Sequence, residues 1–282
     1  MRRTLSAAAL CGALLSSGVT AEAASGPAPA PPPGRVFSYG PHARQHITVY
    51  GGRPERRPAL VILHGGSWAR DTDWSGRARW FAARGFNVYD TDYRLTSDAV
   101  WPAQRQDVLA ALRWVRGREG GERPLVLGSS AGGHLAVQAA TYKAGASRVR
   151  AVAALSPVAS PYRAWVDGGA SGAPADRRAL RGAAQRLAGC RPDRAVRRCW
   201  ARWTDLSAAS HASGRDDAPM LLLHSARDFV PRSHSAGLAA AERRAGLRDI
   251  LTKTVPGGAH GGYLLKSPGV AKNVLQWLRG RA

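Results

Sequence analysis

Short apolar stretches alternate along most of this chain with stretches whose apolar residues recur at helical spacing. The continuous apolar stretches predict strands at 46–50, 59–63, 86–90, 124–128, 149–155, 219–224 and 250–255. The helical spacing predicts helices at 75–85, 101–118, 130–143, 232–245 and 267–279. Strands that alternate with helices are typical of an α/β fold, here a mostly parallel sheet of about eight strands with helices on both faces.

The two ends of this pattern suggest how the chain is divided. Residues 1–23 have a basic start, a short apolar core and the small-residue site Ala21-Glu22-Ala23, which together predict a secretory signal peptide. A proline-rich, disordered lead-in is expected at 24–44, and the folded domain at 45–282. The strand–helix rhythm stops at 157–217, which we interpret as an insertion packed over one end of the sheet.

The cysteines and the charge add to this picture. Cys190 and Cys199 remain after signal cleavage, and an even number of cysteines in an exported chain predicts a disulfide. The formal net charge is +22, but the arginines are spread along the chain, so we favour coding bias over electrostatic association with anionic surfaces. We expect no nucleic-acid partner, no transmembrane segment and no metal or other cofactor.

The stretch "VLGSSAGGH" at 126–134 carries the first candidate for chemistry. Its G-x-S-x-G pattern follows a predicted strand and opens a predicted helix, which is typical of a nucleophile elbow. Only Ser130 has glycine two residues away on both sides, Gly128 and Gly132, while Ser129 occupies the variable position. Ser130 is therefore the candidate nucleophile, and a purely structural glycine-rich turn is the alternative.

A serine nucleophile needs a base and a carboxylate that orients the base. His260 lies in a glycine-rich loop after the strand at 250–255, and Asp228 follows the strand at 219–224, so both are expected at the same edge of the sheet. We expect the other downstream histidines to be packing or surface residues, and the rival aspartates to be solvated. The rivals are His134, His211, His224 and His234, and Asp205, Asp216 and Asp217.

The stretch "LHGGSW" at 63–68 supplies candidate donors for an oxyanion hole. Two glycines allow the backbone to approach a reacting carbonyl closely, so the N–H groups of Gly65 and Gly66 are candidates, with that of Ala131 as a further donor. An ordinary glycine turn is the alternative. Six tryptophans could contact an aryl or sugar group, but we favour packing roles for them. They are Trp68, Trp74, Trp101, Trp165, Trp200 and Trp203.

Together these motifs resemble the α/β-hydrolase esterases and lipases, in particular the group of hormone-sensitive-lipase-like carboxylesterases. The resemblance rests on His64-Gly65-Gly66, "DYRL", "GSSAGG", Asp228 and "GAHGG", in that order. It implies an eight-stranded fold and an acyl-enzyme mechanism in which Ser130, Asp228 and His260 are nucleophile, acid and base. Ser67 stands where the family usually has a third glycine, and HGG-x-W with Trp68 also resembles kynurenine-formamidase-like members.

The sequence therefore predicts a secreted serine carboxylesterase that acts on a small-molecule or polymer-linked ester. An amidase, a formamidase or an acyltransferase could use the same three residues. A non-catalytic protein that binds carbohydrate or the cell envelope is the alternative from another class.

Overall fold

The computed structural model describes residues 34–51 and 57–282. The predicted signal peptide and most of the predicted lead-in lie outside this part of the chain. Eight strands form one sheet in the order β1-β2-β4-β3-β5-β6-β7-β8. They are β1 Arg35–Ser38, β2 His46–Tyr50, β3 Ala59–Leu63, β4 Asn87–Thr91, β5 Leu125–Ser129, β6 Ala151–Leu155, β7 Met220–Ser225 and β8 Ile250–Val255.

The sheet is antiparallel at one edge and parallel elsewhere. The pairs β1–β2 and β2–β4 are antiparallel, and every pair from β4–β3 to β7–β8 is parallel. The predicted mostly parallel sheet is confirmed. The start of the domain is corrected, because residues 35–38, which we assigned to the lead-in, form β1 and pair with β2.

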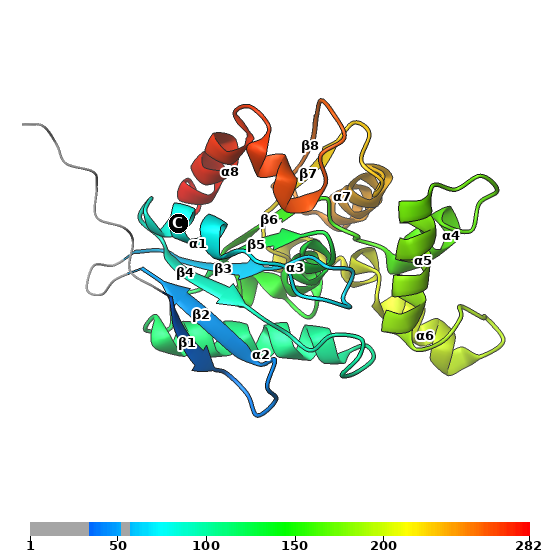
Figure 1. Ribbon diagram of the computed structural model, residues 1–282, viewed down its shortest axis with the longest axis horizontal. Helices are drawn as coiled ribbons and strands as arrows, with labels where there is room; N and C mark the ends of the chain where they lie inside the picture. Colours follow the sequence, from blue (N-terminus) through cyan, green and yellow to red (C-terminus); the bar gives the residue numbers. More distant parts are fainter. Residues whose placement is uncertain (1–33, 52–56) are drawn as a thin grey trace, which may run out of the picture. The chain divides into compact units, whose positions relative to one another are not determined.

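Eight α-helices lie in the described part of the chain (Figure 1). They are α1 Ser75–Ala82, α2 Ala103–Arg118, α3 Ala131–Thr141, α4 Pro161–Asp167, α5 Ala175–Ala188, α6 Arg197–Asp205, α7 Ser233–Ala245 and α8 Val270–Arg279. None of the described helices is long and apolar enough to cross a membrane.

The buried strands place alternate side chains on the two faces of the sheet, and each face has its own apolar core. Leu60 and Ile62 of β3 point into a core that contains residues of α1 and α8. Val61 and Leu63 point into a core that contains residues of α2, α3, α5 and α7. Helices therefore cover both faces, and every residue of the central strands β3, β5, β6 and β7 is buried.

Residues 157–217, between β6 and β7, contain α4, α5 and α6, which lie together at the right of Figure 1. Leu180 and Ala183 of α5 line the same cavity as Gly65, which follows β3, and Ser130, which follows β5. The insertion therefore covers the carboxyl ends of the parallel strands, where reacting groups are commonly placed in such sheets.

Candidate active site

Ser130 lies at a sharp turn between β5 and α3. Its backbone has φ 53° and ψ −112°, a strained conformation for a residue with a side chain. A Cβ atom at Gly128 would lie 2.3 Å from the Gly132 carbonyl oxygen, and one at Gly132 would lie 2.2 Å from the Leu63 carbonyl oxygen. The glycine spacing by which the sequence distinguishes Ser130 from Ser129 is therefore required by close backbone packing.

His260 and Asp228 come together from the loops after β8 and β7. The His260 Nδ1 atom lies 2.7 Å from Asp228 Oδ1. The Asp228 side chain is fully buried, whereas that of His260 is 23% exposed, so the imidazole alone reaches the cavity. Asp228 also accepts hydrogen bonds from the Val230 N–H at 3.0 Å and from the Ser156 hydroxyl.

The surroundings of Asp228 favour its ionised form. Burial by itself would raise the pKa of Asp228, but interactions with His224 and His260 and the hydrogen bond from Ser156 outweigh it and hold the pKa well below its usual range. Asp228 is therefore a carboxylate at neutral pH, which keeps the His260 Nδ1 atom protonated and leaves Nε2 free to accept a proton.

Ser130 and His260 line one cavity of about 800 Å³. Their side chains are not hydrogen-bonded to each other in the described part of the chain, and such contacts commonly tighten only when substrate is bound. Gly65, Gly66 and residues of α5 line the same cavity. The three residues predicted as nucleophile, acid and base thus lie at the sheet edge where the sequence analysis expected them.

The predicted oxyanion donors have free N–H groups. The backbone N–H groups of Gly65, Gly66 and Ala131 donate to no other residue that the structure describes. A Cβ atom at Gly65 would lie 3.5 Å from the Ser130 Cβ, so this loop passes directly beside the serine. Ala131 is the first residue of α3, where the helix leaves its N–H groups unpaired.

Three serines for which the sequence analysis predicted no supporting role hold the His260 loop. Ser129 Oγ accepts a hydrogen bond from the Gly262 N–H at 2.9 Å, and Ser156 Oγ accepts one from the Gly261 N–H at 2.8 Å. Ser225 Oγ donates to the Ala259 carbonyl at 2.7 Å. One available signal was that each serine directly follows or ends a buried strand.

The rival histidines and aspartates have contacts of their own, and His224 lies beside Asp228, with its Nδ1 atom 3.8 Å from Asp228 Oδ2. His134, His224 and His234 are buried, and His134 Nε2 lies 2.8 Å from the Leu206 carbonyl. Our expectation of solvated rival aspartates is wrong for Asp205 and Asp217. Asp205 accepts hydrogen bonds from Trp101 and Arg105, which join the end of α6 to the start of α2. Asp217 accepts hydrogen bonds from Ser213 and the Gly214 N–H within its own turn.

The tryptophans are mainly packing residues, as expected. Trp68, Trp74, Trp101 and Trp203 are 3% exposed or less. Trp74 also lines the cavity, whereas Trp165 and Trp200 do not. Among the described residues, no group of three His, Cys, Asp or Glu side chains is arranged to hold a metal ion.

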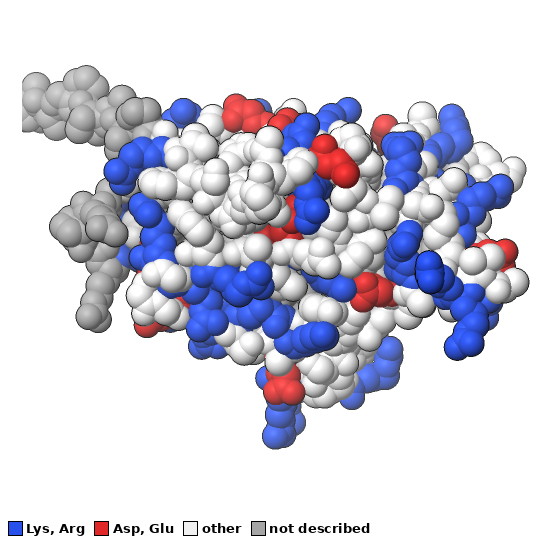
Figure 2. All heavy atoms as spheres, turned by 90° about the horizontal axis from the view of Figure 1, so that it is seen from below, with Lys and Arg blue, Asp and Glu red and all other residues white. Residues whose placement is uncertain are grey.

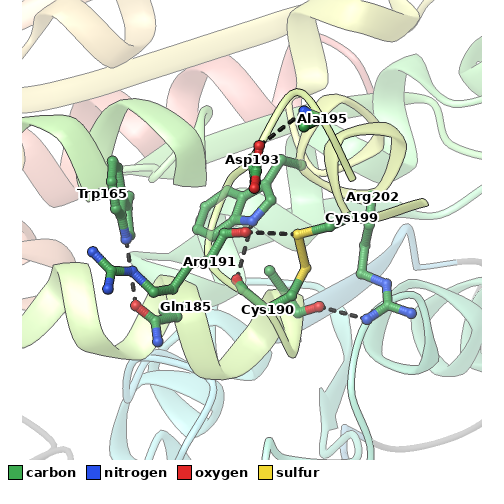
Figure 3. The surroundings of a disulfide bond; sticks show 10 residues. Trp165, Gln185, Cys190, Arg191, Asp193, Ala195, Cys199 and Arg202 are labelled. Carbon is green, nitrogen blue, oxygen red and sulfur yellow. Dashed lines mark hydrogen bonds between the residues drawn. A yellow bond between two sulfur atoms is a disulfide. The ribbon is translucent and has the colours of Figure 1, made fainter. Parts of the chain in front are cut away.

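The predicted disulfide between Cys190 and Cys199 is present (Figure 3). Cys190 follows the end of α5, and Cys199 lies in α6. Trp203 Nε1 donates to the Cys190 carbonyl at 3.2 Å, and Arg202 of α6 donates to the Ala188 carbonyl. The disulfide therefore links a helix that lines the cavity to the neighbouring helix of the insertion.

Comparisons with known proteins agree with this architecture. Residues 48–155 match the family model described as BD-FAE. This span includes the loop with Gly65 and Gly66 and the turn at Ser130, but it ends before Asp228 and His260.

Several solved esterases have a similar structure. Esterase B from Lactobacillus rhamnosis is 24% identical, with a TM-score of 0.69 over 89% of this chain and 85% of that one. An acetyl ester-xyloside bifunctional hydrolase from Caldicellulosiruptor lactoaceticus is 21% identical, with a TM-score of 0.69 over 90% and 98%. Thermogutta terrifontis esterase 2, phosphonylated by sarin, is 22% identical, with a TM-score of 0.66 over 87% and 92%. The strand order and these similarities together show that this chain has the α/β-hydrolase fold.

Proposed function

We propose that this protein is a secreted serine carboxylesterase. The observation that carries the proposal is that His260, held by the buried Asp228 carboxylate at 2.7 Å, opens into the same cavity as the strained Ser130. Esterase names among the similar structures and the BD-FAE match support an ester as the substrate. The disulfide supports export, because such bonds persist in oxidising compartments.

In the proposed reaction, Ser130 Oγ attacks the carbonyl carbon of the ester while His260 Nε2 takes the hydroxyl proton. The negative charge that develops on the carbonyl oxygen is stabilised by the free N–H groups of Gly65, Gly66 and Ala131. His260 then returns the proton to the departing alcohol, which leaves an acyl group on Ser130. Water, deprotonated by His260, attacks this acyl-enzyme and releases the carboxylic acid.

The test compares the two adjacent serines. Ser130→Ala should lower kcat/KM for p-nitrophenyl butyrate by at least about 10⁴-fold and abolish labelling by a fluorophosphonate probe. Ser129→Ala is the matched control, because it removes the hydroxyl of the adjacent serine, whose Oγ accepts a hydrogen bond from the Gly262 N–H. This variant should leave the labelling at Ser130 intact. Labelling that survives in Ser130→Ala and disappears in Ser129→Ala would contradict the assignment. Absence of both hydrolysis and labelling in the folded wild type would favour a binding protein.

A further inference from the structure

Three arginine side chains line the candidate active-site cavity without a carboxylate partner. Arg70 follows the oxyanion loop, Arg77 lies on α1 and Arg186 on α5. None of them forms an ion pair with an acidic residue of the described chain. By contrast, Arg94 and Arg281 lie within 2.7 Å of Asp107 and Asp249, respectively. The cavity arginines are therefore not used for ion pairs that hold the fold.

Arg77 is held in place beside the His260 loop. Its guanidinium carbon lies 4.7 Å from the centre of the Trp74 ring and 5.8 Å from that of Tyr263. Arg77 Nε donates to the Gly262 carbonyl at 3.3 Å, which leaves the two terminal nitrogens available. A Cβ atom at Gly262 would lie 3.2 Å from the guanidinium carbon, so glycine permits this approach two residues from His260. Little freedom remains to be lost when an anion binds.

Two acidic residues, Asp73 and Asp176, also line the cavity, but they leave the guanidinium groups available. The Asp73 carboxylate accepts a hydrogen bond from the Ser75 N–H at 2.8 Å at the start of α1. This hydrogen bond is the main cause of a lowered pKa of Asp73, and the positive charges of Arg79 and Arg77 lower it further from beyond ion-pair distance. Neither aspartate lies within ion-pair distance of Arg70, Arg77 or Arg186 among the described contacts.

We propose that the site selects esters that carry a carboxylate close to the scissile bond, with Arg77 as the main contact and Arg186 as a second contact from the insertion. This inference rests on the proposed ester hydrolysis. A planar guanidinium group can donate two parallel hydrogen bonds to a carboxylate, and such charged hydrogen bonds are stronger than neutral ones. Arg77 lies on α1 and Arg186 on α5 of the insertion. The anionic end of the substrate would therefore be bound from two sides, by the fixed Arg77 and by the insertion.

The test uses pairs of esters in which an anionic member is compared with a neutral one of similar shape. Mono-p-nitrophenyl glutarate and p-nitrophenyl pentanoate place a carboxylate or a methyl group at the same distance on the acyl side. The pair 4-acetoxybenzoate and methyl 4-acetoxybenzoate places a carboxylate or its neutral methyl ester on the leaving-group side, and release of the acetyl group is measured for both. For at least one pair, Arg77→Gln should lower the anionic-to-neutral ratio of kcat/KM by about tenfold, with a smaller fall for Arg186→Gln. Arg113→Gln, at an exposed position of α2, is the control for net charge.

A second measurement separates this inference from the proposed function. Calorimetric binding of the same esters to Ser130→Ala requires no turnover. Tighter binding of an anionic ester that is lost in Ser130→Ala/Arg77→Gln would support the inference even if the wild type hydrolysed neither ester. The inference is wrong if, in both pairs, the anionic-to-neutral ratios of kcat/KM and the binding affinities change no more in the Arg77 and Arg186 variants than in Arg113→Gln. In that case, hydrolysis of the neutral esters would leave the esterase proposal intact.

Discussion

Ser156 connects the acid of the proposed triad to the loop of its base. Its hydroxyl donates to Asp228 Oδ2 and accepts a hydrogen bond from the Gly261 N–H at 2.8 Å. The residue itself has φ 51°, directly after β6. Ser156 therefore fixes the orientation of the carboxylate and the position of the residue next to His260 through one oxygen atom.

We predict that Ser156→Ala lowers kcat/KM by roughly 10- to 100-fold, because a hydrogen bond to a charged group contributes ~1.5–3 kcal/mol. Ser225→Ala is the matched control, since the Ser225 hydroxyl holds the same loop through the Ala259 carbonyl, and the contact of Ser225 with Asp228 is made by its backbone carbonyl, which the substitution keeps. Steady-state kinetics with p-nitrophenyl butyrate, together with the unfolding midpoints of both variants, would test this. Equal losses of kcat/KM at equal loss of stability would show that Ser156 acts only on the structure of the loop.

The sequence was informative about Ser130, His260 and Asp228 for physical reasons. The glycines around Ser130 form a local sequence pattern, although the atoms that require them are partly local, as at Gly128, and partly on the neighbouring β3 end, as at Gly132. A strand that precedes a polar loop predicts the edge at which that loop lies. The supporting serines were not predictable in this way. The hydrogen bonds of Ser129 and Ser156 join residues 133 and 105 positions apart, respectively, and depend on how the strands are ordered.

Among the elements, the buried strands were the best predicted, because burial on both faces requires continuous apolar sequence. Each of the seven predicted strands lies within two residues of an observed one. β1 was missed because it is a short edge strand whose Val36 is 64% exposed, so the core imposes little pattern on it. The helices of the insertion were not resolved in the sequence analysis, since their abundant arginines and alanines obscured the apolar spacing.

Removal of the disulfide tests how the insertion is held. We predict that the double variant Cys190→Ser/Cys199→Ser is less stable by about 2.5–3 kcal/mol, the chain-entropy effect of closing so short a loop. The midpoint of thermal unfolding should fall by roughly 5–12 °C. Because α5 lines the cavity, KM for p-nitrophenyl butyrate should also rise. An unchanged midpoint would show that the contacts of Trp203 and Arg202 hold the two helices together without the covalent link.

At the scale of the whole molecule, positive charge predominates. The formal net charge is +22, and Figure 2 shows Lys and Arg side chains distributed over much of the face in view, with few Asp and Glu among them. Coding bias remains our interpretation of this general excess. The cavity arginines differ from it because of their location at the candidate site and their lack of ion pairs with the described carboxylates.

Buried titratable groups determine how the stability of the molecule depends on pH. Burial raises the pKa of Glu242 from 4.5 to about 8, and burial together with Asp92 raises that of Asp90 from 3.8 to about 7. Burial lowers the pKa of His134 from 6.5 to about 4 and that of His234 from 6.5 to about 3. Through these four groups the folded protein keeps two protons that the unfolded chain releases, and rejects two that the unfolded chain takes up.

The signs of these effects differ. As the pH rises, the fold is destabilised through Asp90 up to about pH 7 and through Glu242 up to about pH 8. As the pH falls below 6.5, the fold is destabilised through His134 and His234. The two trends oppose each other between pH 4.5 and 6.5, and only the carboxyl groups act above that range. We therefore predict a broad maximum of stability that ends near pH 6.5, followed by a fall of up to about 1.4 kcal/mol per pH unit for each proton released.

Glu242 isolates the alkaline part of this profile. It is fully buried in α7, and the neighbouring Asp217 carboxylate adds to the effect of burial in raising its pKa. In urea unfolding followed by tryptophan fluorescence, Glu242→Gln should largely remove the fall in stability between pH 7 and 8, because glutamine has no proton to release in that range. Glu122→Gln, which changes a side chain that is 71% exposed, is the matched control and should keep the wild-type slope. A wild-type slope in Glu242→Gln would show that another group releases the proton.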